Sequence, residues 1–415
     1  MTSELAEPQE AYVWVWLPGA SEPAVAGLLE RSPSGALDFN YAASYLERSE
    51  AISLYEPELP LQRGRFAARD GVVASCLRDA SPDTWGRRVI VDRWADPSID
   101  DLGELTYMLE SGSDRIGALD FQASPHEYVA REHGQATLEE LESAAHALDS
   151  GEPLSPALAE ALVHGTSIGG ARPKALLSDG DRRLIAKFSS STDRFPVVRG
   201  EFVAMRLARA AGLDVAEVEL TEAGGRDVLL IERFDRPGNG ERRLLVSALT
   251  MLGLGEMDAA LDSSYATLAT VIRARFADPT ATLRELFGRI AFNILCSNTD
   301  DHARNHAAFW DGEWLRLTPA YDVCPQARSG GETRQAMAIG ADGWRFSQLA
   351  GCVARAGEYL LGRDPERQAR EIVDHQLATI HERWDEICDE ARLTKSQRDA
   401  FWGRQFLNPY ALYDY

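Results

Sequence analysis

Residues 298–306 read NTDDHARNH and hold more polar chemistry than any other stretch of this length in the chain. Before them, Leu283, Phe287, Ile290 and Ile294 follow one another at spacings of four, three and four residues, the pattern of a helix with one buried face. We therefore expect residues 298–306, called the acidic loop below, to lie on a loop that a rigid helix holds.

A hairpin and a second acidic position follow this loop. Asp311-Gly312 has apolar residues on both sides, which is a strong signal for a two-residue hairpin, and Asp322 comes after it. A loop carboxylate such as Asp300, an asparagine such as Asn305 and a later Asp are the groups with which phosphotransferases place a base and two Mg²⁺ ligands around ATP. The D-x-x-x-x-N spacing alone is common, and loop Asp and Asn residues often only form turns. The helix and the hairpin favour the phosphotransferase interpretation.

His302 and His306 raise a second possibility, a zinc site, because they lie four residues apart. Two zinc ligands at this spacing require a helix, which the surrounding Asp, Arg and Asn residues do not favour. We therefore expect loop histidines that pack or hydrogen-bond and so shape the backbone near Asp300.

Residues 165–174, called the glycine-rich segment below, read GTSIGGARPK and precede the apolar run 175–177. Backbone amides of such segments can bind phosphate, because glycine permits close approach of a ligand. The segment lacks the G-K-[ST] of a Walker A loop. A tight hairpin turn is an equally good interpretation of it.

Lys187 stands among apolar residues in the strand predicted over 184–188. Its ammonium either contacts a phosphate, with Glu201 of the next helix as its ion-pair partner, or faces solvent on an amphipathic strand. The later apolar strand 228–231 ends in Glu232-Arg233-Phe234. In a two-lobe kinase the backbone at this place offers one N–H and one C=O to the adenine edge, so this prediction depends on architecture and not on residue type.

The composition is that of an ordinary globular protein. With 415 residues, 45% of them hydrophobic and 26% charged, the chain can form two or three domains around a sizeable core. It has no apolar run of the roughly 18 residues that a membrane span needs. The polar, acidic N-terminus does not resemble a signal peptide. Five scattered cysteines without metal-binding spacing favour a reduced, cytoplasmic location.

The chain carries 43 basic and 65 acidic residues, which gives a formal net charge of −22. Such a surface disfavours extensive contact with the phosphates of DNA, and it suits a basic protein partner. Solubility alone is the simpler explanation of the same charge.

The order of the predicted elements divides the chain into three parts. Residues 11–125 are predicted to form a β-rich unit, residues 126–236 a small lobe of strands and helix, and residues 237–415 a mainly helical lobe that carries the acidic loop. Two lobes joined by the end of a strand make a natural nucleotide cleft. The expected fold class is α+β.

Capping residues set the limits of two of the predicted helices. The helix of the β-rich unit is predicted to begin with Ser81 as N-cap and Pro82 at the first helical position. Gly212 is predicted to end the helix over 200–211. The other elements are strands at 13–17, 37–41, 116–121, 215–220 and 228–231, and helices at 135–148, 283–294 and 373–387.

With these residues in hand, the chain resembles the HipA family of serine/threonine kinases, the toxin halves of HipBA-type toxin–antitoxin modules. The N-terminal matches are VWL at 15–17, PDTWGRR at 82–88 and IGAL at 116–119. The later matches are SIGGA at 167–171, IAK at 185–187, ERFDR at 232–236, TDDHARN at 299–305 and LTPAYD at 317–322. Together they span nearly the whole chain, and their order is far more specific than any one of them.

The resemblance implies a bilobal, protein-kinase-like α+β fold, with a small α/β N-lobe, a mostly helical C-lobe and an additional N-terminal β-rich subdomain. It implies Asp300 as the catalytic base, Asn305 and Asp322 as Mg²⁺ ligands, and Ser167 or the adjacent Thr166 as the site of autophosphorylation. A phosphoserine adds a charge of about −1.5 to −2 beside the place of the ATP phosphates, which fits self-inactivation. The implied nucleotide-binding residues are Gly169, Gly170, Ala171, Arg172, Lys174, Lys187, Glu232, Phe234, His302, Asn305, Tyr321 and Asp322.

The sequence departs from the family pattern in two places. The glycine-rich segment ends in Arg172-Pro173-Lys174 where members carry Gln-Glu-Lys, and Asp301 stands where Gly is often found. The first departure puts the phosphate contacts of the segment in question. The second adds negative charge beside Asp300, which either repels substrate or supplies a further metal contact. Neither touches the inferred base, lysine or metal ligands, so we expect an active kinase.

The resemblance implies ATP- and Mg²⁺-dependent phosphorylation of a protein serine or threonine. It suggests an aminoacyl-tRNA synthetase as target, glutamyl-tRNA synthetase first, with growth arrest as the outcome. A small helix-turn-helix antitoxin, bound to operator DNA, is the expected partner, and no membrane is involved. One alternative is a catalytically weak, ATP-binding corepressor that acts with the antitoxin, and another is a small-molecule or lipid kinase.

Overall fold

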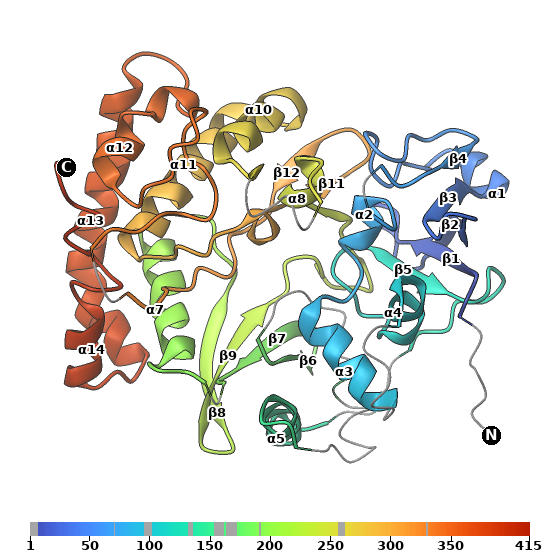
Figure 1. The fold of residues 1–415 in the computed structure, drawn as a ribbon, viewed down its shortest axis with the longest axis horizontal. Coiled ribbons are helices and arrows are strands. Elements are labelled where there is room, and N and C mark those ends of the chain that lie inside the picture. Colours follow the sequence, from blue (N-terminus) through green and yellow to red (C-terminus); the bar gives the residue numbers. More distant parts are fainter. Residues whose placement is uncertain are drawn as a thin grey trace.

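The computed structural model describes residues 7–69, 71–94, 102–131, 136–152, 162, 172–190, 192–255, 262–328 and 331–415. Within these ranges the chain has a mixed α/β fold, with strands in three sheets (Figure 1). Five residues expected in the phosphate site lie outside the described residues, namely Thr166, Ser167, Gly169, Gly170 and Ala171.

The first sheet and its helices occupy residues 10–122, called the N-terminal unit below and drawn in blue and cyan in Figure 1. Its elements are β1 (Glu10–Val15), β2 (Ala24–Arg31), β3 (Leu37–Tyr41), α1 (Ala43–Leu46), β4 (Arg65–Phe66), α2 (Ser75–Arg78), α3 (Thr84–Trp94), α4 (Glu104–Glu110) and β5 (Leu119–Gln122). The antiparallel strand order is β4-β3-β2-β1-β5, so the strand expected to close the unit pairs with β1.

The predicted start of α3 at Ser81 is wrong. The helix begins at Thr84, and the carbonyl of Asp83 accepts the amide of Arg87 at 2.8 Å, so Asp83 is the residue before the helix. The hydroxyl of Ser81 donates instead to the carboxylate of Glu104 on α4, at 2.5 Å. The Ser81 hydroxyl therefore bonds a residue of another helix and does not cap α3 as the local pattern predicted.

The second sheet holds the strand of Lys187. Its elements are α5 (Leu138–Asp149), β6 (Lys174–Asp179), β7 (Arg182–Phe188), α7 (Val197–Ala210), β8 (Val218–Ala223) and β9 (Arg226–Glu232). The antiparallel order is β6-β7-β9-β8. Ala186 and Phe188 pack with Trp85 of α3 and with α5 in one apolar cluster. Because side chains alternate along a strand, Lys187 lies on the other face, toward α7.

The remaining residues form a small sheet and most of the helices. The α-helices from residue 265 onward lie on the side of the molecule away from the N-terminal unit, and the small sheet lies between them and that unit (Figure 1). The hairpin predicted at Asp311-Gly312 is confirmed, and Trp310 pairs with Leu315 across it. The elements are β10 (Leu245–Ser247), α8 (Ala248–Met251), α10 (Tyr265–Arg275), α11 (Pro279–Leu295), η1 (Ala303–Asn305), β11 (Ala307–Trp310), β12 (Leu315–Leu317), α12 (Leu349–Val353), η2 (Ala356–Glu358), α13 (Pro365–Glu390) and α14 (Lys395–Phe401).

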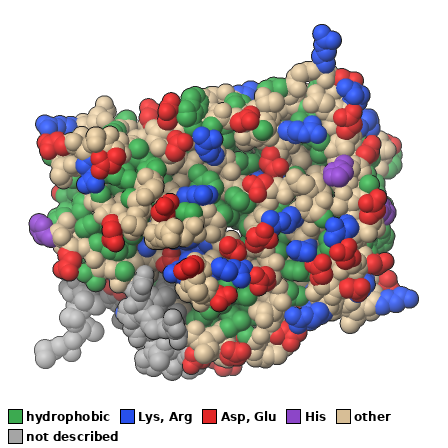
Figure 2. All heavy atoms as spheres, turned by 180° about the vertical axis from the view of Figure 1, so that it is seen from behind, with side chains coloured by type: hydrophobic (Ala, Val, Ile, Leu, Met, Phe, Trp, Pro, Cys, Tyr) green, Lys and Arg blue, Asp and Glu red, His purple; other side chains and the backbone are tan. Residues whose placement is uncertain are grey.

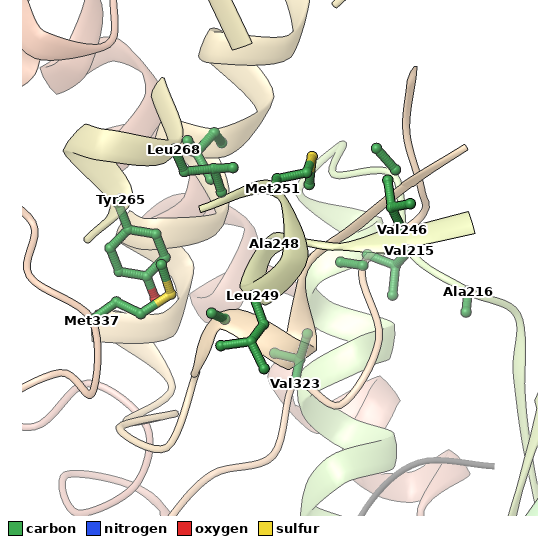
Figure 3. Close-up of a cluster of buried hydrophobic side chains, with 14 of the residues drawn as sticks. Val215, Ala216, Val246, Ala248, Leu249, Met251, Tyr265, Leu268, Val323 and Met337 are labelled. Atoms are coloured by element: carbon green, nitrogen blue, oxygen red, sulfur yellow. The ribbon is translucent and has the colours of Figure 1, made fainter. Parts of the chain in front are cut away.

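The main apolar core lies directly behind the segments that carry the acidic residues. Leu249 of α8, Tyr265 of α10 and Val323, the residue after Asp322, belong to one cluster of buried side chains (Figure 3). The predicted face of α11 is buried in the same core, Leu283 and Ile294 included. Close packing leaves the backbone at both ends of the acidic loop little freedom to move.

A buried ionic network joins the N-terminal unit to the end of β9. Asp235 accepts hydrogen bonds from the amide of Gly117 at 2.8 Å, from Arg233 Nη2 at 2.8 Å and from Arg236 Nη1 at 2.9 Å. Gly117 has a φ of +77°, which glycine adopts without strain. Both arginines also pair with Asp114, at 2.9 and 2.8 Å. The ERFDR motif therefore serves as the anchor of the N-terminal unit.

The cysteines lie in the interior, and charged side chains lie on the surface (Figure 2). All five cysteines are buried, and none forms a disulfide within the described ranges. Acidic and basic side chains are interspersed on the face shown in Figure 2, so the net charge of −22 does not gather in one patch of that face. Among the helices that the structure describes, none has both the length and the apolar character that crossing a membrane requires.

Removal of one carboxylate from the network tests its contribution to stability. Asp235→Ala removes a carboxylate that pairs with both Arg233 and Arg236, whose side chains are buried. We therefore expect the free energy of unfolding to fall by about 3–5 kcal/mol. Urea denaturation followed by tryptophan fluorescence measures this. The control is Glu386→Ala, which removes an exposed pair with Arg383 and should cost less than about 1 kcal/mol. Equal losses in both variants would contradict the assignment.

Acid should weaken the same network. Burial works against the charged forms of Asp114 and Asp235, but the neighbouring guanidinium groups outweigh it and hold the pKa of each carboxyl below its usual range. A carboxyl with a lowered pKa in the folded state adds stability that is present above its unfolded pKa, about 3.9, and is lost as the pH falls below it. Denaturation midpoints measured from pH 7 to pH 3 should therefore drop below about pH 4. The drop should be smaller in Asp235→Ala.

Candidate active site

Lys187 bridges two carboxylates that come from different parts of the chain. From β7 its ammonium Nζ lies 2.6 Å from Glu201 Oε1 on α7 and 2.5 Å from Asp322 Oδ1. The ion pair with Glu201 that the sequence predicted is confirmed. The contact with Asp322 brings the second sheet and the segment after the β11–β12 hairpin to one point.

The three groups set one another's charge. Burial disfavours the ammonium of Lys187, but Asp322 and Glu201 outweigh it and raise the pKa of Lys187 above its usual value. Burial also works against the ionised Asp322 carboxyl, yet Lys187 lowers the pKa of Asp322 to about 2. Burial raises the pKa of Glu201, and the Lys187 ammonium opposes this. Lys187 is therefore positively charged and Asp322 negatively charged throughout the neutral range.

The backbone holds Asp322 in an unusual conformation. Its φ is +59°, a left-handed value that is uncommon for residues other than glycine. The Asp322 carbonyl accepts the amide of Cys324 at 3.0 Å and the side-chain amide of Asn298 at 3.5 Å. Residues held in such conformations often belong to functional sites, because the surrounding structure must offset their cost.

The side chains of the adjacent residues Asp300 and Asp301 lie in different environments. Asp300 is exposed, whereas Asp301 is 3% exposed. Partial desolvation raises the pKa of the Asp300 carboxyl, His302 opposes the shift, and the charge of Asp322 adds to it. Asp300 therefore remains accessible to a substrate beside the Lys187–Asp322 pair.

Asp301 is a structural anchor of the acidic loop. Its Oδ2 accepts hydrogen bonds from the Tyr265 hydroxyl and from Asn293 Nδ2 at 2.8 Å, and it lies 2.8 Å from His306 Nε2. The two roles considered for Asp301, repelling substrate and binding metal, both need a carboxylate that faces outward, and this one faces the core.

The same contacts explain the histidines. His306 is buried and bonded to Asp301, as expected of a loop histidine that packs and hydrogen-bonds. His302 lies outside the core, just before η1. Among the residues that the structure describes, no three His, Cys, Asp or Glu side chains gather in a way that could hold a metal ion. The residues between the two histidines form the 3-10 turn η1 and not the α-helix that the zinc spacing requires.

Tyr321 connects the acidic loop to the end of β9. Its hydroxyl donates to the carbonyl of Arg304 at 2.7 Å, and its ring centroid lies 5.7 Å from that of Phe234. Asn305, at the end of η1, is only 8% exposed, and its amide donates to the carbonyl of His302 at 2.8 Å. The structure thus brings Phe234, Tyr321 and the loop of Asn305 together.

The sheet limits what Glu232 can offer to a ligand. Its amide donates to the carbonyl of Glu217 at 2.9 Å, and the amide of Arg233 donates to Arg183 at 2.9 Å. The Glu232 carboxylate pairs with Arg182 at 3.1 Å. Of the N–H and C=O groups of Glu232, only the carbonyl remains for a ligand within the described residues. The next amide along the chain after that of Arg233 is the amide of Phe234.

The end of the glycine-rich segment has two cations with different surroundings. Arg172 Nη2 donates to both oxygens of Asp193, at 2.8 and 2.6 Å, so a phosphate contact by Arg172 would require it to leave that partner. Lys174 is 2% exposed. It lies directly opposite Lys187 in the β6–β7 register, so both lysines project from the same face of the sheet.

These residues fit the phosphates of a nucleotide and a hard divalent cation. Two lysines directly opposite each other repel, and a bound polyanion would relieve that repulsion. The amide oxygen of Asn305 and the carboxylate of Asp322 are oxygen donors of the kind that Mg²⁺ accepts, and Mg²⁺ commonly takes only one or two protein carboxylates.

Sequence reasoning had no role for four of these residues. Asn293 and Tyr265 hold Asp301, Asp193 holds Arg172, and Asn298 ties the acidic loop to Asp322. Asn293 gave a usable signal, because it is a polar residue inside the apolar run of α11. Tyr265, Asp193 and Asn298 gave no such signal, because the partner of each lies far away in the sequence.

Family models match both parts of the chain. The model of the HipA-like C-terminal domain matches residues 166–384, and the model of the HipA N-terminal domain matches residues 15–122. The mixed α/β chain thus has both parts of a known class of toxin kinases. It belongs to the HipA family, and the resemblance that the motifs predicted is confirmed.

Individual relatives extend over all or part of the chain. Y4mE of Sinorhizobium fredii, a protein named as a kinase, is 26% identical over 423 residues, 92% of this chain and 98% of that protein. The serine/threonine-protein kinase toxin HipA of Shewanella oneidensis is 29% identical over 146 residues, 31% of this chain and 34% of that protein.

A solved structure shows the same fold. It is the Shewanella oneidensis toxin–antitoxin complex of HipA, HipB and operator DNA, with a TM-score of 0.71 at 19% identity over 94% of this chain and 93% of that chain. The coverage shows that the likeness includes the N-terminal part as well as the part around Lys187 and Asp322.

The two adjacent carboxylates should differ in their effect on stability. Asp301→Ala leaves Tyr265, Asn293 and His306 with buried polar atoms that lack a partner, so we expect a loss of about 2–4 kcal/mol. Asp300→Ala changes an exposed side chain and should alter stability by less than about 0.5 kcal/mol. Urea denaturation of both variants measures the difference, and similar losses would rule out the separate roles.

Proposed function

We propose that this protein is an ATP- and Mg²⁺-dependent serine/threonine protein kinase and the toxin of a toxin–antitoxin pair. The observation that carries the proposal is the position of Lys187 between Glu201 and Asp322, with Asp300 exposed beside them. Protein kinases need a strand lysine paired with a helix glutamate, a metal-binding Asp and a base on a separate loop. The arrangement of these residues in two lobes, with the boundaries 125 and 236, is part of the proposal.

The residues then have distinct roles. Asp300 accepts the proton of a serine or threonine hydroxyl while the new bond forms between that oxygen and the γ-phosphorus and the bond to ADP breaks. Lys187 and Lys174 hold phosphate oxygens. Asn305 and Asp322 are the cation ligands, and the bound Mg²⁺ neutralises phosphate charge.

The nucleoside end of the site is assigned to the segment after β9. The carbonyl of Glu232 and the amide of Phe234 face the adenine edge, since the amides of Glu232 and Arg233 are used by the sheet. The rings of Phe234 and Tyr321 supply an apolar surface beside it. His302 and the glycine-rich residues Gly169, Gly170, Ala171 and Arg172 complete the proposed site.

The cellular role is proposed from family membership. The expected target is an aminoacyl-tRNA synthetase, with glutamyl-tRNA synthetase as the first candidate, and its phosphorylation arrests growth. A helix-turn-helix antitoxin is the proposed partner, because the similar solved structure contains HipA with HipB and operator DNA. Autophosphorylation at Ser167, with Thr166 as the alternative acceptor, is proposed to switch the kinase off by adding charge beside the phosphate site.

Incubation with γ-labelled ATP and Mg²⁺ tests the kinase proposal. We expect label on the wild-type protein, none on Asp300→Ala because the base is missing, and none on Ser167→Ala because the acceptor is missing. The stability of Asp300→Ala should match that of the wild type, which makes it a clean test of chemistry.

The other outcomes separate the alternatives. Label that persists on Ser167→Ala but not on Asp300→Ala places the acceptor elsewhere, with Thr166→Ala as the next variant. ATP binding without label on any protein rejects the kinase and favours an ATP-binding corepressor that acts with the antitoxin. Equal labelling of wild type and Asp300→Ala would show that Asp300 is not the base.

A further inference from the structure

One buried arginine of α11 has no role in the site described so far, namely Arg289, which is 4% exposed. Its Nε donates to Glu285 Oε1 at 2.7 Å, one turn earlier on the same helix. Its Nη2 donates to two backbone carbonyls, that of Asp214 at 3.1 Å and that of Thr318 at 2.9 Å. The guanidinium therefore joins two segments that lie far apart in the sequence.

The first of these segments directly continues α7, the helix that carries Glu201. The helix is closed at Gly212, as the sequence predicted, and this residue has a φ of +85°. The amides of Gly212 and Leu213 donate to carbonyls of the last turn, at 2.9 and 3.1 Å, in the pattern of a Schellman motif. Asp214 is the next residue, so its backbone has a fixed position relative to α7.

The second segment leads to Asp322. The amide of Ala320 donates to the carbonyl of Asp214 at 2.7 Å, and the carbonyl of Ala320 accepts the amide of Ala216 at 2.9 Å. The two segments thus form a short parallel bridge. Asp322 lies two residues further along the chain, where it contacts Lys187 at 2.5 Å. The end of α7 and the approach to Asp322 are therefore bonded directly to each other.

Helix α11 comes unusually close to this junction. A Cβ at Gly288 would lie only 2.9 Å from Leu213 Cδ2, so glycine is needed at this position for the close approach. Glu285 Oε1, already bonded to Arg289, also accepts the amide of Asp214 at 3.1 Å. The Glu285–Arg289 pair therefore holds both the N–H and the C=O group of Asp214.

These bonds connect the parts that a kinase must bring together. Phosphoryl transfer in protein kinases requires the strand lysine paired with the helix glutamate and, at the same time, the metal-binding Asp in its place. Here the helix glutamate is Glu201 of α7, and the metal-binding Asp is Asp322. Because the Glu285–Arg289 pair and the parallel bridge join the end of α7 to the segment before Asp322, a shift of one moves the other.

We propose that Arg289 is a positioning residue of the candidate active site. By binding the carbonyls of Asp214 and Thr318, it gives the proposed cation ligand Asp322 a fixed position relative to α7 and hence to the Lys187–Glu201 pair. The inference rests on the proposed function, since it assumes that Asp322 is a ligand of the Mg²⁺ that accompanies ATP.

Arg289→Met tests this role, because methionine fills much of the same space and makes none of the three hydrogen bonds. The measurement is the factor by which Mg²⁺ strengthens the binding of the non-hydrolysable analogue AMP-PNP, from calorimetric titrations with Mg²⁺ and with EDTA. We expect this factor to fall about tenfold, since residues that orient a metal ligand typically affect metal affinity by 10–100-fold. The affinity for adenosine, which needs no cation, should stay at the wild-type value.

A second variant tests whether Arg289 and Glu285 act as one unit. Glu285→Ala should lower the Mg²⁺ factor in the same direction, and it should cause no further fall in the Arg289→Met background. If Arg289→Met does not fold, Arg289→Lys replaces it. Lysine keeps the positive charge opposite Glu285 but lacks the separate nitrogens with which the guanidinium reaches the two carbonyls, so the factor should still fall.

The matched control is Arg355→Met. Arg355 also joins a carboxylate to a backbone carbonyl, that of Asp342 at 2.6 Å and that of Gly351 at 3.1 Å. Its hydrogen bonds within the described residues do not reach the segments at 214–216 and 318–322. This control should have the Mg²⁺ factor of the wild type.

The results distinguish this inference from the proposed function. A wild-type Mg²⁺ factor in Arg289→Met overturns the role of Arg289 and leaves the ATP site in place. An equal loss for adenosine, a full further fall in the double variant, or the same fall in Arg355→Met also overturns it, because the effect then does not pass through the Glu285–Arg289 pair and Asp322. A wild-type protein that binds no AMP-PNP, or binds it without any effect of Mg²⁺, removes the proposed function and this inference together.

Discussion

The pairing of buried charges at the end of β9 is the constraint on which the rest of the molecule depends. Arg233, Arg236 and Asp235 are almost wholly removed from water, and an unpaired charge at such a place costs several kcal/mol. Their partners are Asp114 and the backbone at Gly117, which belong to the N-terminal unit. The strand end that leads to Phe234 therefore has its observed course only when the N-terminal unit is in place.

This dependence changes how the N-terminal unit is understood. A unit with its own sheet could be an independent module, but here its core is continuous with that of the helices, and polar contacts cross the junction at several places. One place is the strand end beside Phe234. Another is the start of α3, where the indole of Trp85 donates to the carbonyl of Lys174. Both flank the Lys187 site, so the N-terminal unit forms part of the frame that sets its geometry.

Local patterns predicted the parts of the fold whose causes are local. The hairpin at Asp311-Gly312 and the buried face of α11 follow from turn chemistry and helical period, and both are present. The N-cap at Ser81 was wrong because Glu104, which lies on a different helix, takes its hydroxyl. The two roles considered for Asp301 were wrong because Tyr265 of α10 and Asn293 of α11 bind its carboxylate inside the core. The motif residues could be named from sequence, but which of two adjacent carboxylates faces the core could not.

The charges around Lys187 place a condition on any nucleotide that binds there. Asp322 Oδ1 accepts a hydrogen bond from the Lys187 ammonium, and the same carboxylate is the proposed cation ligand. Lys187 is also held by Glu201, so it keeps one partner if Asp322 turns toward a cation. The second partner lets Lys187 exchange a carboxylate for a phosphate without ever lying unpaired in a buried place, which would be costly.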